Sequence, residues 1–211
     1  MNDVVKIEPA TTKTTKQRGR PTAFNQDVAL DKALNVFWSH GYEGASMAEL
    51  TKAIGINKPS IYAAFGNKEA LFRKVLARYI TGAVAFVGEA MKESTAHQAV
   101  EKFLLQAVEF FSDKSTPNGC MIVQGALTCG ESAGAIQQEL IAYRHHFEIS
   151  LTKRFELAKE QGDLPQYTNT KQLAKYVATI HQGMSVQSTS GTSREELLAI
   201  VEIALKNWPK H

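Results

Sequence analysis

Cysteine, signal-like segments and long apolar runs are scarce or missing, and each scarcity excludes a class of protein. The 211 residues contain only Cys120 and Cys129, too few for a disulfide scaffold, so a reducing cytoplasm is expected. No apolar stretch approaches the roughly 18 residues of a membrane-spanning helix, since even the run at 83–87 lies between Gly82 and Gly88. The polar N-terminus has no signal-peptide core. We therefore expect a cytoplasmic protein without a membrane partner.

Strand signals are also missing. We find no run of alternating apolar and polar residues, no Asn-Gly hairpin and no internal repeat. Hydrophobic residues make up 44% of the chain and charged residues 21%, which is enough to build a core. Apolar positions instead recur at helical spacing between glycines and polar capping residues. The sequence predicts an all-α fold of about nine helices, over 26–40, 46–54, 57–66, 67 to about 91, 95–112, 119–128, 136–162, 170–187 and 194–207.

Charge is divided unevenly along the chain. Residues 1–80 carry 12 Lys/Arg against 7 Asp/Glu, whereas residues 81–211 carry 12 against 14. Residues 1–22 hold five basic side chains and almost nothing to bury, as expected of a flexible basic arm. A basic first third favours contact with a polyanion, although a solvated helical surface would give the same imbalance.

The most informative segment is residues 46–72, SMAELTKAIGINKPSIYAAFGNKEALF. It predicts two short helices joined by a tight turn at Gly55, which is helix-turn-helix geometry for the DNA major groove. Ser46 and Glu49 form a capping box, and the apolar residues suit a small core. The side chains left to face outward are Asn57, Lys58, Pro59, Ser60, Tyr62 and Ala63.

Lys68 falls in the first turn of the fourth predicted helix, capped by Asn67, where the helix dipole disfavours a cation. A helix N-terminus is itself an anion site, so a lysine there favours a docked phosphate. The alternative is a solvated lysine near Glu69.

Residues 25–72 resemble the N-terminal domain of the TetR family of transcriptional regulators. The matching features are GYEGAS at 41–46, the pattern A-x-G-I-x-K-P-S-I-Y at 53–62, Phe65, and NKEALF at 67–72. The resemblance implies a basic arm (1–22), a helix-turn-helix DNA-binding domain (23–82), and a helical ligand-binding and dimerisation domain (83–211). It implies a homodimeric, ligand-responsive regulator, most simply a repressor released from a palindromic double-stranded operator by a small-molecule inducer.

The resemblance also implies roles for individual residues. Ser46 corresponds to a capping residue whose hydroxyl meets a phosphate, and Tyr62 to an aromatic that packs on the DNA backbone. Lys58, Pro59 and Ser60 correspond to the start of the recognition helix, and Lys68 to a phosphate-binding lysine. The chain departs from the family pattern at Ala63 and Ala64, where many members carry histidine or tyrosine. Specificity is therefore expected to depend more on DNA shape and on the arm, in which Arg18 and Arg20 suit a minor groove or remain solvated.

In the second domain a ligand pocket would lie among the helices. Its candidate residues, each of which could equally be ordinary core, are Phe103, Phe110, Met121, Gln124, Tyr143, Phe147 and His181. The last two helices would form the dimer interface as a four-helix bundle, with an apolar stripe of Leu197, Leu198, Val201, Ala204 and Leu205 on the final helix.

Other functions find less support in the sequence. Cys120 and Cys129 could sense electrophiles but equally suit small buried residues, and the adjacent pair His145 and His146 cannot chelate a metal together on a helix. No nucleophile elbow, Walker loop, dinucleotide fingerprint or HExxH pair is present, so neither an enzyme nor a cofactor is expected. A protein-binding adaptor is less consistent with basic charge concentrated at the helix-turn-helix.

Overall fold

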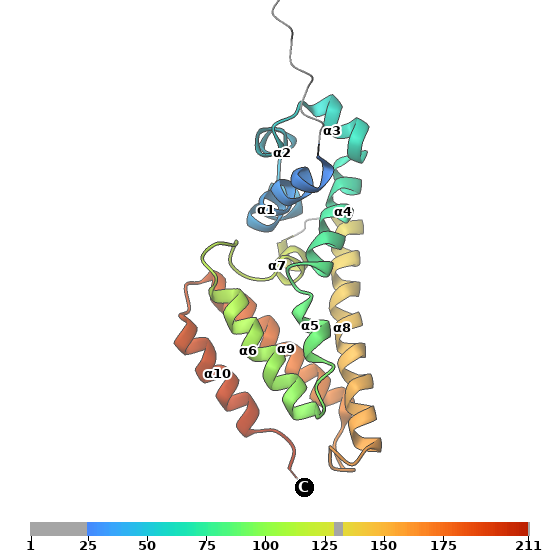
Figure 1. Ribbon diagram of the computed structural model, residues 1–211, viewed down its shortest axis with the longest axis vertical. Coiled ribbons are helices and arrows are strands. Elements are labelled where there is room, and N and C mark those ends of the chain that lie inside the picture. Colours follow the sequence, from blue (N-terminus) through green and yellow to red (C-terminus); the bar gives the residue numbers. More distant parts are fainter. Residues whose placement is uncertain (1–24, 129–132, 211) are drawn as a thin grey trace, which may run out of the picture.

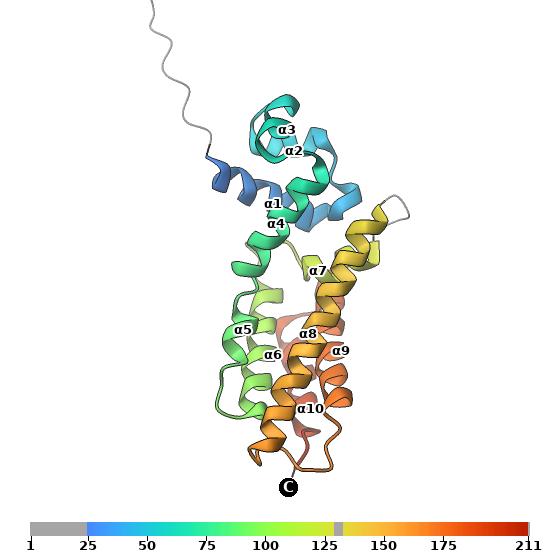
Figure 2. The ribbon, with the colours of Figure 1, turned by 90° about the vertical axis from the view of Figure 1, so that its right-hand side faces the viewer.

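A computed structural model describes residues 25–128 and 133–210, and within these ranges the chain forms ten α-helices and no strand. The expected all-α fold is confirmed. One end of the elongated molecule is built from α1 (Gln26–Gly44), α2 (Met47–Ile54), α3 (Lys58–Phe65) and α4 (Lys68–Thr81). The larger end is a bundle of α5 (Phe86–Ala90), α6 (Ala96–Ser112), α7 (Met121–Thr128), α8 (Gly134–Glu160), α9 (Thr170–Thr189) and α10 (Arg194–Lys206) (Figures 1 and 2).

The first four helices begin where a polar side chain can accept a hydrogen bond from the first turn. Asn25, Ser46, Asn57 and Asn67 each accept from a backbone N–H two or three residues further on. The capping box of Ser46 and Glu49 is complete in both directions. These caps fix the starts of α2, α3 and α4, and therefore the geometry between them.

A small aromatic and aliphatic core holds α2 and α3 against α1 and α4. Leu50, Ile61 and Leu71 are fully buried together with Phe37 of α1. The Phe37 ring meets the Phe72 ring edge-on, with centroids 5.1 Å apart. These contacts hold the four helices together at one end of a hydrophobic core that continues into the bundle.

The predicted long fourth helix is interrupted. Regular helix stops at Thr81, Gly82 adopts a non-helical conformation, and the separate short helix α5 follows. A Cβ at Gly82 would approach the backbone oxygen of Arg78 to 3.0 Å, so glycine fits this break closely. The prediction of one continuous helix to about Met91 is wrong, and this division raises the number of helices to ten.

Ion pairs connect α4 to helices on either side. Arg78 binds Asp27 and Asp31 on α1, with its Nε 2.5 Å from an Asp31 oxygen. Arg73 binds Glu69 on its own helix and Glu139 on α8, with Nε 2.8 Å from the Glu139 oxygen. The ion pair between Arg73 and Glu139 is therefore a direct polar link between the two ends of the molecule.

Within the bundle, α9 packs along α8 and α10 packs along α6. Leu197, Val201 and Ala204 of α10 are buried in this packing, which corrects the prediction that they supply a dimer interface. Leu198 and Leu205 are half-buried against the same core. In the described part of the chain, no helix has both the length and the apolar character needed to cross a bilayer.

Candidate functional site

The first candidate surface lies on α2 and α3. Gly55 joins the two helices with a φ of +85°, a left-handed conformation in which a Cβ would be strained. Ile54 and Ile61, on either side of this turn, are buried. This tight connection holds α3 at a fixed angle across α2, so that one face of α3 points away from the core.

The outward face of α3 carries the residues predicted to contact DNA. Lys58, Pro59, Ser60 and Tyr62 are all exposed, and 41% of Tyr62 is accessible. The Lys58 ammonium lies 5.7 Å from the centre of the Tyr62 ring, one turn away. A cation, a hydroxyl and an aromatic ring thus share one solvent-facing patch at the start of this helix.

Asn57 and Ser46 have side chains already engaged in capping. The Asn57 Oδ1 accepts from the Ser60 N–H at 2.9 Å, and the Ser46 Oγ accepts from the Glu49 N–H at 3.1 Å. Both residues are exposed, so their unused hydrogen-bonding capacity faces solvent. Their structural role is to orient the two helix N-termini.

Lys68 lies in the first turn of α4 and reaches back to the segment after Gly41. Its Nζ is 4.6 Å from the centre of the Tyr42 ring and donates a 3.4 Å hydrogen bond to the Glu43 carbonyl. Desolvation lowers the pKa of Lys68, and the nearby Glu43 and Glu49 carboxylates partly oppose that shift. The ammonium is therefore partly withdrawn from water and positioned at the N-terminal ends of the helices.

These features form one polar surface at the end of the molecule. It combines the N-termini of α2, α3 and α4 with the cations Lys58 and Lys68, all of which attract anions. The phosphate backbone of a nucleic acid is an anion that such a surface can bind. Arg18 and Arg20, predicted to extend this surface, lie outside the described residues.

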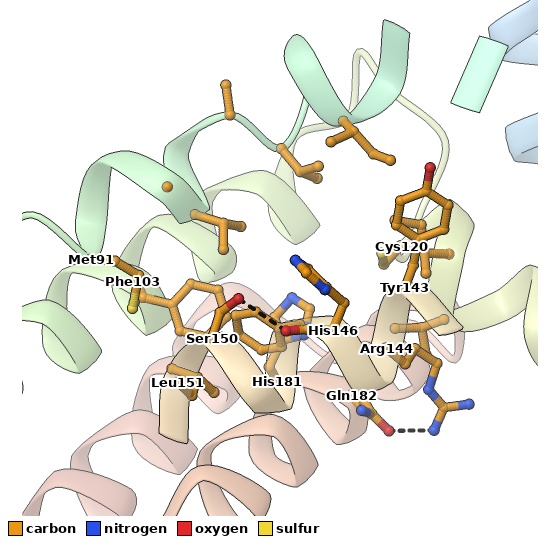
Figure 3. A pocket seen from close by; sticks show the side chains of 18 residues that line it. Met91, Phe103, Cys120, Tyr143, Arg144, His146, Ser150, Leu151, His181 and Gln182 are labelled. Atoms are coloured by element: carbon orange, nitrogen blue, oxygen red, sulfur yellow. Dashed lines mark hydrogen bonds between the residues drawn. The ribbon is translucent and has the colours of Figure 1, made fainter. Parts of the chain in front are cut away.

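The second candidate site is a cavity of about 390 Å³ in the bundle (Figure 3). Its wall comes from the end of α4, α5, α6, the segment before α7, α7 itself, α8 and α9, so it lies beside the junction with the first four helices. The volume falls in the range of small-molecule sites. The lining residues are Ile80, Val84, Ala85, Val87, Gly88, Met91, Phe103, Cys120, Ile122, Val123, Tyr143, Arg144, His146, Phe147, Ser150, Leu151, His181 and Gln182.

The structure brings Phe103, Tyr143, Phe147 and His181 together around this cavity, as four of the seven candidates. It places the other three elsewhere. The Phe110 ring stacks on the Trp38 indole at 5.4 Å, and Met121 is buried in the core. The Gln124 amide donates to the Ser185 carbonyl at 3.3 Å.

Several lining residues were not foreseen. The apolar side of the cavity formed by Val84, Val87 and Met91 exists because the chain breaks at Gly82 and turns α5 over the bundle. Arg144, His146 and Ser150 lie on α8, whose helical spacing was recognised without indicating which side faces a cavity. In the sequence, the glycines at 82 and 88 were the available signal that the chain breaks here.

Polar groups in the cavity wall have different surroundings. An Arg144 Nη donates to the Gln182 Oε1 at 2.5 Å, and the Ser150 hydroxyl donates to the His146 carbonyl at 2.9 Å (Figure 3). The His181 ring lies within 5.0 to 5.9 Å of three phenylalanine rings, and burial lowers the pKa of His181 to about 4. His181 is therefore neutral at physiological pH.

Cys120 lies in the cavity wall and is almost completely buried. The Tyr79 hydroxyl donates to its Sγ at 3.4 Å, and burial raises the pKa of the Cys120 thiol, which keeps it protonated. This environment does not activate a thiolate. Cys129 lies outside the described residues, and among the residues that are described no group of three or more His, Cys, Asp and Glu could hold a metal ion.

Residues 119–121 connect the cavity wall to α1 and α4. The Trp38 indole of α1 donates to the Gly119 carbonyl at 2.9 Å, and the Met121 N–H donates to the Tyr79 hydroxyl of α4 at 3.3 Å. The Cys120 N–H donates to the Ser185 hydroxyl of α9 at 2.8 Å. We call residues 119–121 the junction segment, because it binds α1, α4 and α9 and also borders the cavity.

Two family models of known proteins match separate parts of this chain. Residues 29–75 match the family model for bacterial regulatory proteins of the tetR family, and residues 96–200 match that for the tetracyclin repressor-like C-terminal domain. The chain is 36% identical over 198 residues to the HTH-type transcriptional repressor ComR of Escherichia coli K12, covering 92% of this chain and 94% of ComR. It is 28% identical to the repressor BdcR of the same organism, over 92% of this chain and 94% of BdcR.

The chain is also similar to a solved structure of CifR, a cysteine-substituted TetR family regulator in complex with 26-base-pair operator DNA. It is 40% identical, with a TM-score of 0.86, and the match covers 90% of this chain and 100% of CifR. The molecule carries a surface of helix N-termini and cations at one end and a cavity in the bundle, and both of its parts match family models. The chain therefore belongs to the TetR family of DNA-binding transcriptional regulators.

Proposed function

We propose that this protein is a homodimeric repressor that binds a palindromic operator and leaves it when a small molecule fills the cavity. The observation that carries the proposal is the exposed start of α3, where Lys58, Ser60 and Tyr62 face solvent, with Lys68 at the start of the next helix. The names of ComR and BdcR as repressors, and the operator complex of CifR, support the same function. A regulator acting on DNA would work in the cytoplasm, and this role requires no catalysis.

On the proposed operator, the residues divide between reading and positioning. Lys58, Pro59 and Ser60 would enter the major groove, where Lys58 and Ser60 can reach base edges. Tyr62, Ser46 and Lys68 would contact the phosphate backbone, together with the N-termini of α2 and α4. Asn57 would hold the first turn of α3, and Arg18 and Arg20 would add minor-groove contacts.

A selection of duplexes from a random library tests this function. One recognition helix of eight residues reads few base pairs, so useful specificity requires two copies and a palindromic site. The selected duplex should bind with an affinity that falls steeply as salt increases, because phosphate contacts release counterions. Equal affinity for selected and random duplexes at physiological salt would contradict the proposal.

The dimer is proposed to form through the outer faces of α9 and α10. With Leu197, Val201 and Ala204 used inside the protomer, Ile203 of α10 remains 60% exposed and Val186 of α9 remains 39% exposed. Exposed apolar side chains on the last two helices suit a second copy of the chain.

Two isoleucines allow a matched test of this interface. Ile203→Glu should shift the protein towards monomer in analytical ultracentrifugation, since it buries a charge between subunits. Ile149 on α8, 51% exposed, provides the control, and Ile149→Glu should leave the association constant unchanged. Dissociation by Ile149→Glu and not by Ile203→Glu would move the interface to α8.

The junction segment and α4 are proposed to transmit ligand binding to α3. Ile80 near the end of α4 and Cys120 in the junction segment both border the cavity, and Tyr79 contacts the latter. A ligand that displaces these groups would therefore move α1 and α4, which carry the helix-turn-helix. By linkage, the operator must weaken ligand binding by the same factor by which the ligand weakens operator binding.

A further inference from the structure

The cavity wall is mostly apolar and carries no carboxylate among its lining residues. Val84, Val87 and Met91 supply one part of the apolar wall, and Phe103, Phe147 and Leu151 supply another. A cationic ligand would find no counter-charge in this wall. The desolvation cost of a charge would then have no compensation except contact with aromatic rings.

Among the lining residues that the structure describes, Arg144 carries the one guanidinium, and its partner is a neutral amide. Arg144 donates to Gln182 at 2.5 Å, and the two residues lie together at one side of the site (Figure 3). Other polar groups also have protein partners. The Ser150 hydroxyl donates to its own helix, and the Cys120 sulfur accepts from Tyr79. The Ser150 hydroxyl and the Cys120 sulfur therefore offer little to a ligand unless these hydrogen bonds break.

His181 differs from the exposed Tyr143 and His146 of the same wall because its imidazole is half-buried, and it has no hydrogen-bond partner among the residues that the structure describes. It is held instead between rings, with centroid distances of 5.0 Å to Phe103, 5.5 Å to Phe111 and 5.9 Å to Phe147. A neutral imidazole carries one N–H donor and one bare nitrogen acceptor, and leaving them unpaired in an apolar site costs free energy. The ring lines the cavity, so a ligand can supply the missing partner.

We propose that the cavity takes a neutral, mainly apolar molecule with a single hydroxyl or carbonyl group, and that His181 is the residue that selects this group. The proposal rests on the proposed function of the cavity as an inducer site. The apolar body of the ligand would lie against α5 and the phenylalanines. Its oxygen would exchange a hydrogen bond with His181, in a site where a cationic head group would meet no carboxylate and an anionic one would have to reach Arg144, at the side of the site where it bonds Gln182.

Three probes with the same two-ring body test the ligand class by calorimetry at neutral pH: 2-naphthol, 2-naphthoate and 2-naphthylmethylammonium. We expect the neutral 2-naphthol to bind at least about tenfold more tightly than either ion. An equal or greater affinity for the anion would mean that Arg144 leaves Gln182 to recognise it, and would overturn the proposal. Greater affinity for the cation, or no binding of 2-naphthol at millimolar concentration, would overturn it equally.

Variants test the selecting residue. His181→Phe keeps an aromatic ring but removes both hydrogen-bonding atoms, and should weaken 2-naphthol binding about tenfold. His181→Gln restores a donor and an acceptor and should recover most of the affinity. His145→Phe is the matched control, because His145 lies next to His146 on α8 but is exposed and does not line the cavity, and it should change the affinity less than threefold. If His181→Phe bound 2-naphthol as well as the unaltered protein, the assignment of His181 would be wrong.

Duplex binding, measured on the same preparations, separates this proposal from the function on which it rests. Variants that bind the selected duplex normally are folded, so an altered ligand preference then concerns the cavity alone. A protein that binds 2-naphthol as expected but no duplex would refute the repressor function and leave the ligand class standing.

Discussion

Replacing Trp38 by phenylalanine should reveal how firmly the cavity end of the molecule holds the DNA-binding end. The Trp38 indole, only 7% exposed, donates a 2.9 Å hydrogen bond to the Gly119 carbonyl, 81 residues away in sequence. Its ring also meets the Tyr79 ring edge-on at 5.0 Å and stacks on Phe110 at 5.4 Å. The side chain thus joins α1 to α4, to α6 and to the junction segment.

The expected cost has two parts. Phenylalanine leaves the buried Gly119 carbonyl without its donor, which costs about 1–3 kcal/mol. The smaller ring also loses roughly three buried heavy atoms, at about 0.8 kcal/mol for each methylene-sized group, or about 2 kcal/mol. The free energy of unfolding should therefore fall by about 3–5 kcal/mol.

Trp208 provides the control because it lies beyond α10, at the far end of the bundle. It is 9% exposed and packs on His97 and Phe155, and within the described part of the chain its indole makes no hydrogen bond. Trp208→Phe should cost only the packing loss of about 2 kcal/mol. Urea unfolding of both variants measures the difference.

Affinity for the selected duplex is the second readout, measured well below the unfolding midpoint. Trp38→Phe should change the coupling between ligand and duplex, while Trp208→Phe should leave it intact. Equal destabilisation in the two variants, with unchanged coupling in both, would refute the role given to the Trp38 hydrogen bond.

Three further predictions concern the other sites. Lys68→Ala should weaken binding to every duplex and reduce the salt slope by about one, which a titration of affinity against salt measures. Lys58→Ala or Ser60→Ala should instead alter sequence preference in a repeated selection, because these side chains are proposed to reach base edges. The lowered pKa of His181 predicts acid lability: below its ordinary value of 6.5 the unfolded chain binds a proton that the native state refuses until about pH 4. The contribution of His181 to the free energy of unfolding is complete above pH 6.5 and should thus decrease by about 1.4 kcal/mol at pH 5.5. Urea unfolding at neutral pH and at about pH 5.5 measures this decrease, and His181→Phe should abolish it.

The helix starts were predictable because capping is a local interaction. The structure confirms Ser46 with Glu49 as a complete capping box, and Ser193 with Glu196 forms another, each within four residues. The break at Gly82 was missed for the opposite reason. An isolated glycine is tolerated in a helix, and only the packing of α5 over the cavity decides that the chain turns here.

The dimer stripe was misassigned because an apolar pattern does not identify what covers it. Leu197, Val201 and Ala204 have the spacing of a buried face, and the structure buries them against α6 of the same chain. Amphipathicity predicts burial alone. The more informative signal on α10 is Ile203, an apolar residue outside the stripe that the protomer leaves exposed.

The two candidate sites differ in how far apart along the chain their residues lie, and this explains why one was easier to predict. The surface on α2, α3 and α4 depends on contacts within residues 37–72, so sequence spacing determines most of its geometry. The cavity joins residues from 80 to 182, and its shape depends on how separate helices meet. Phe103 and Phe110 lie on the same helix with similar chemistry, yet one lines the cavity and the other stacks on Trp38. That choice depends on which helix packs against each turn of α6, and therefore requires the three-dimensional arrangement.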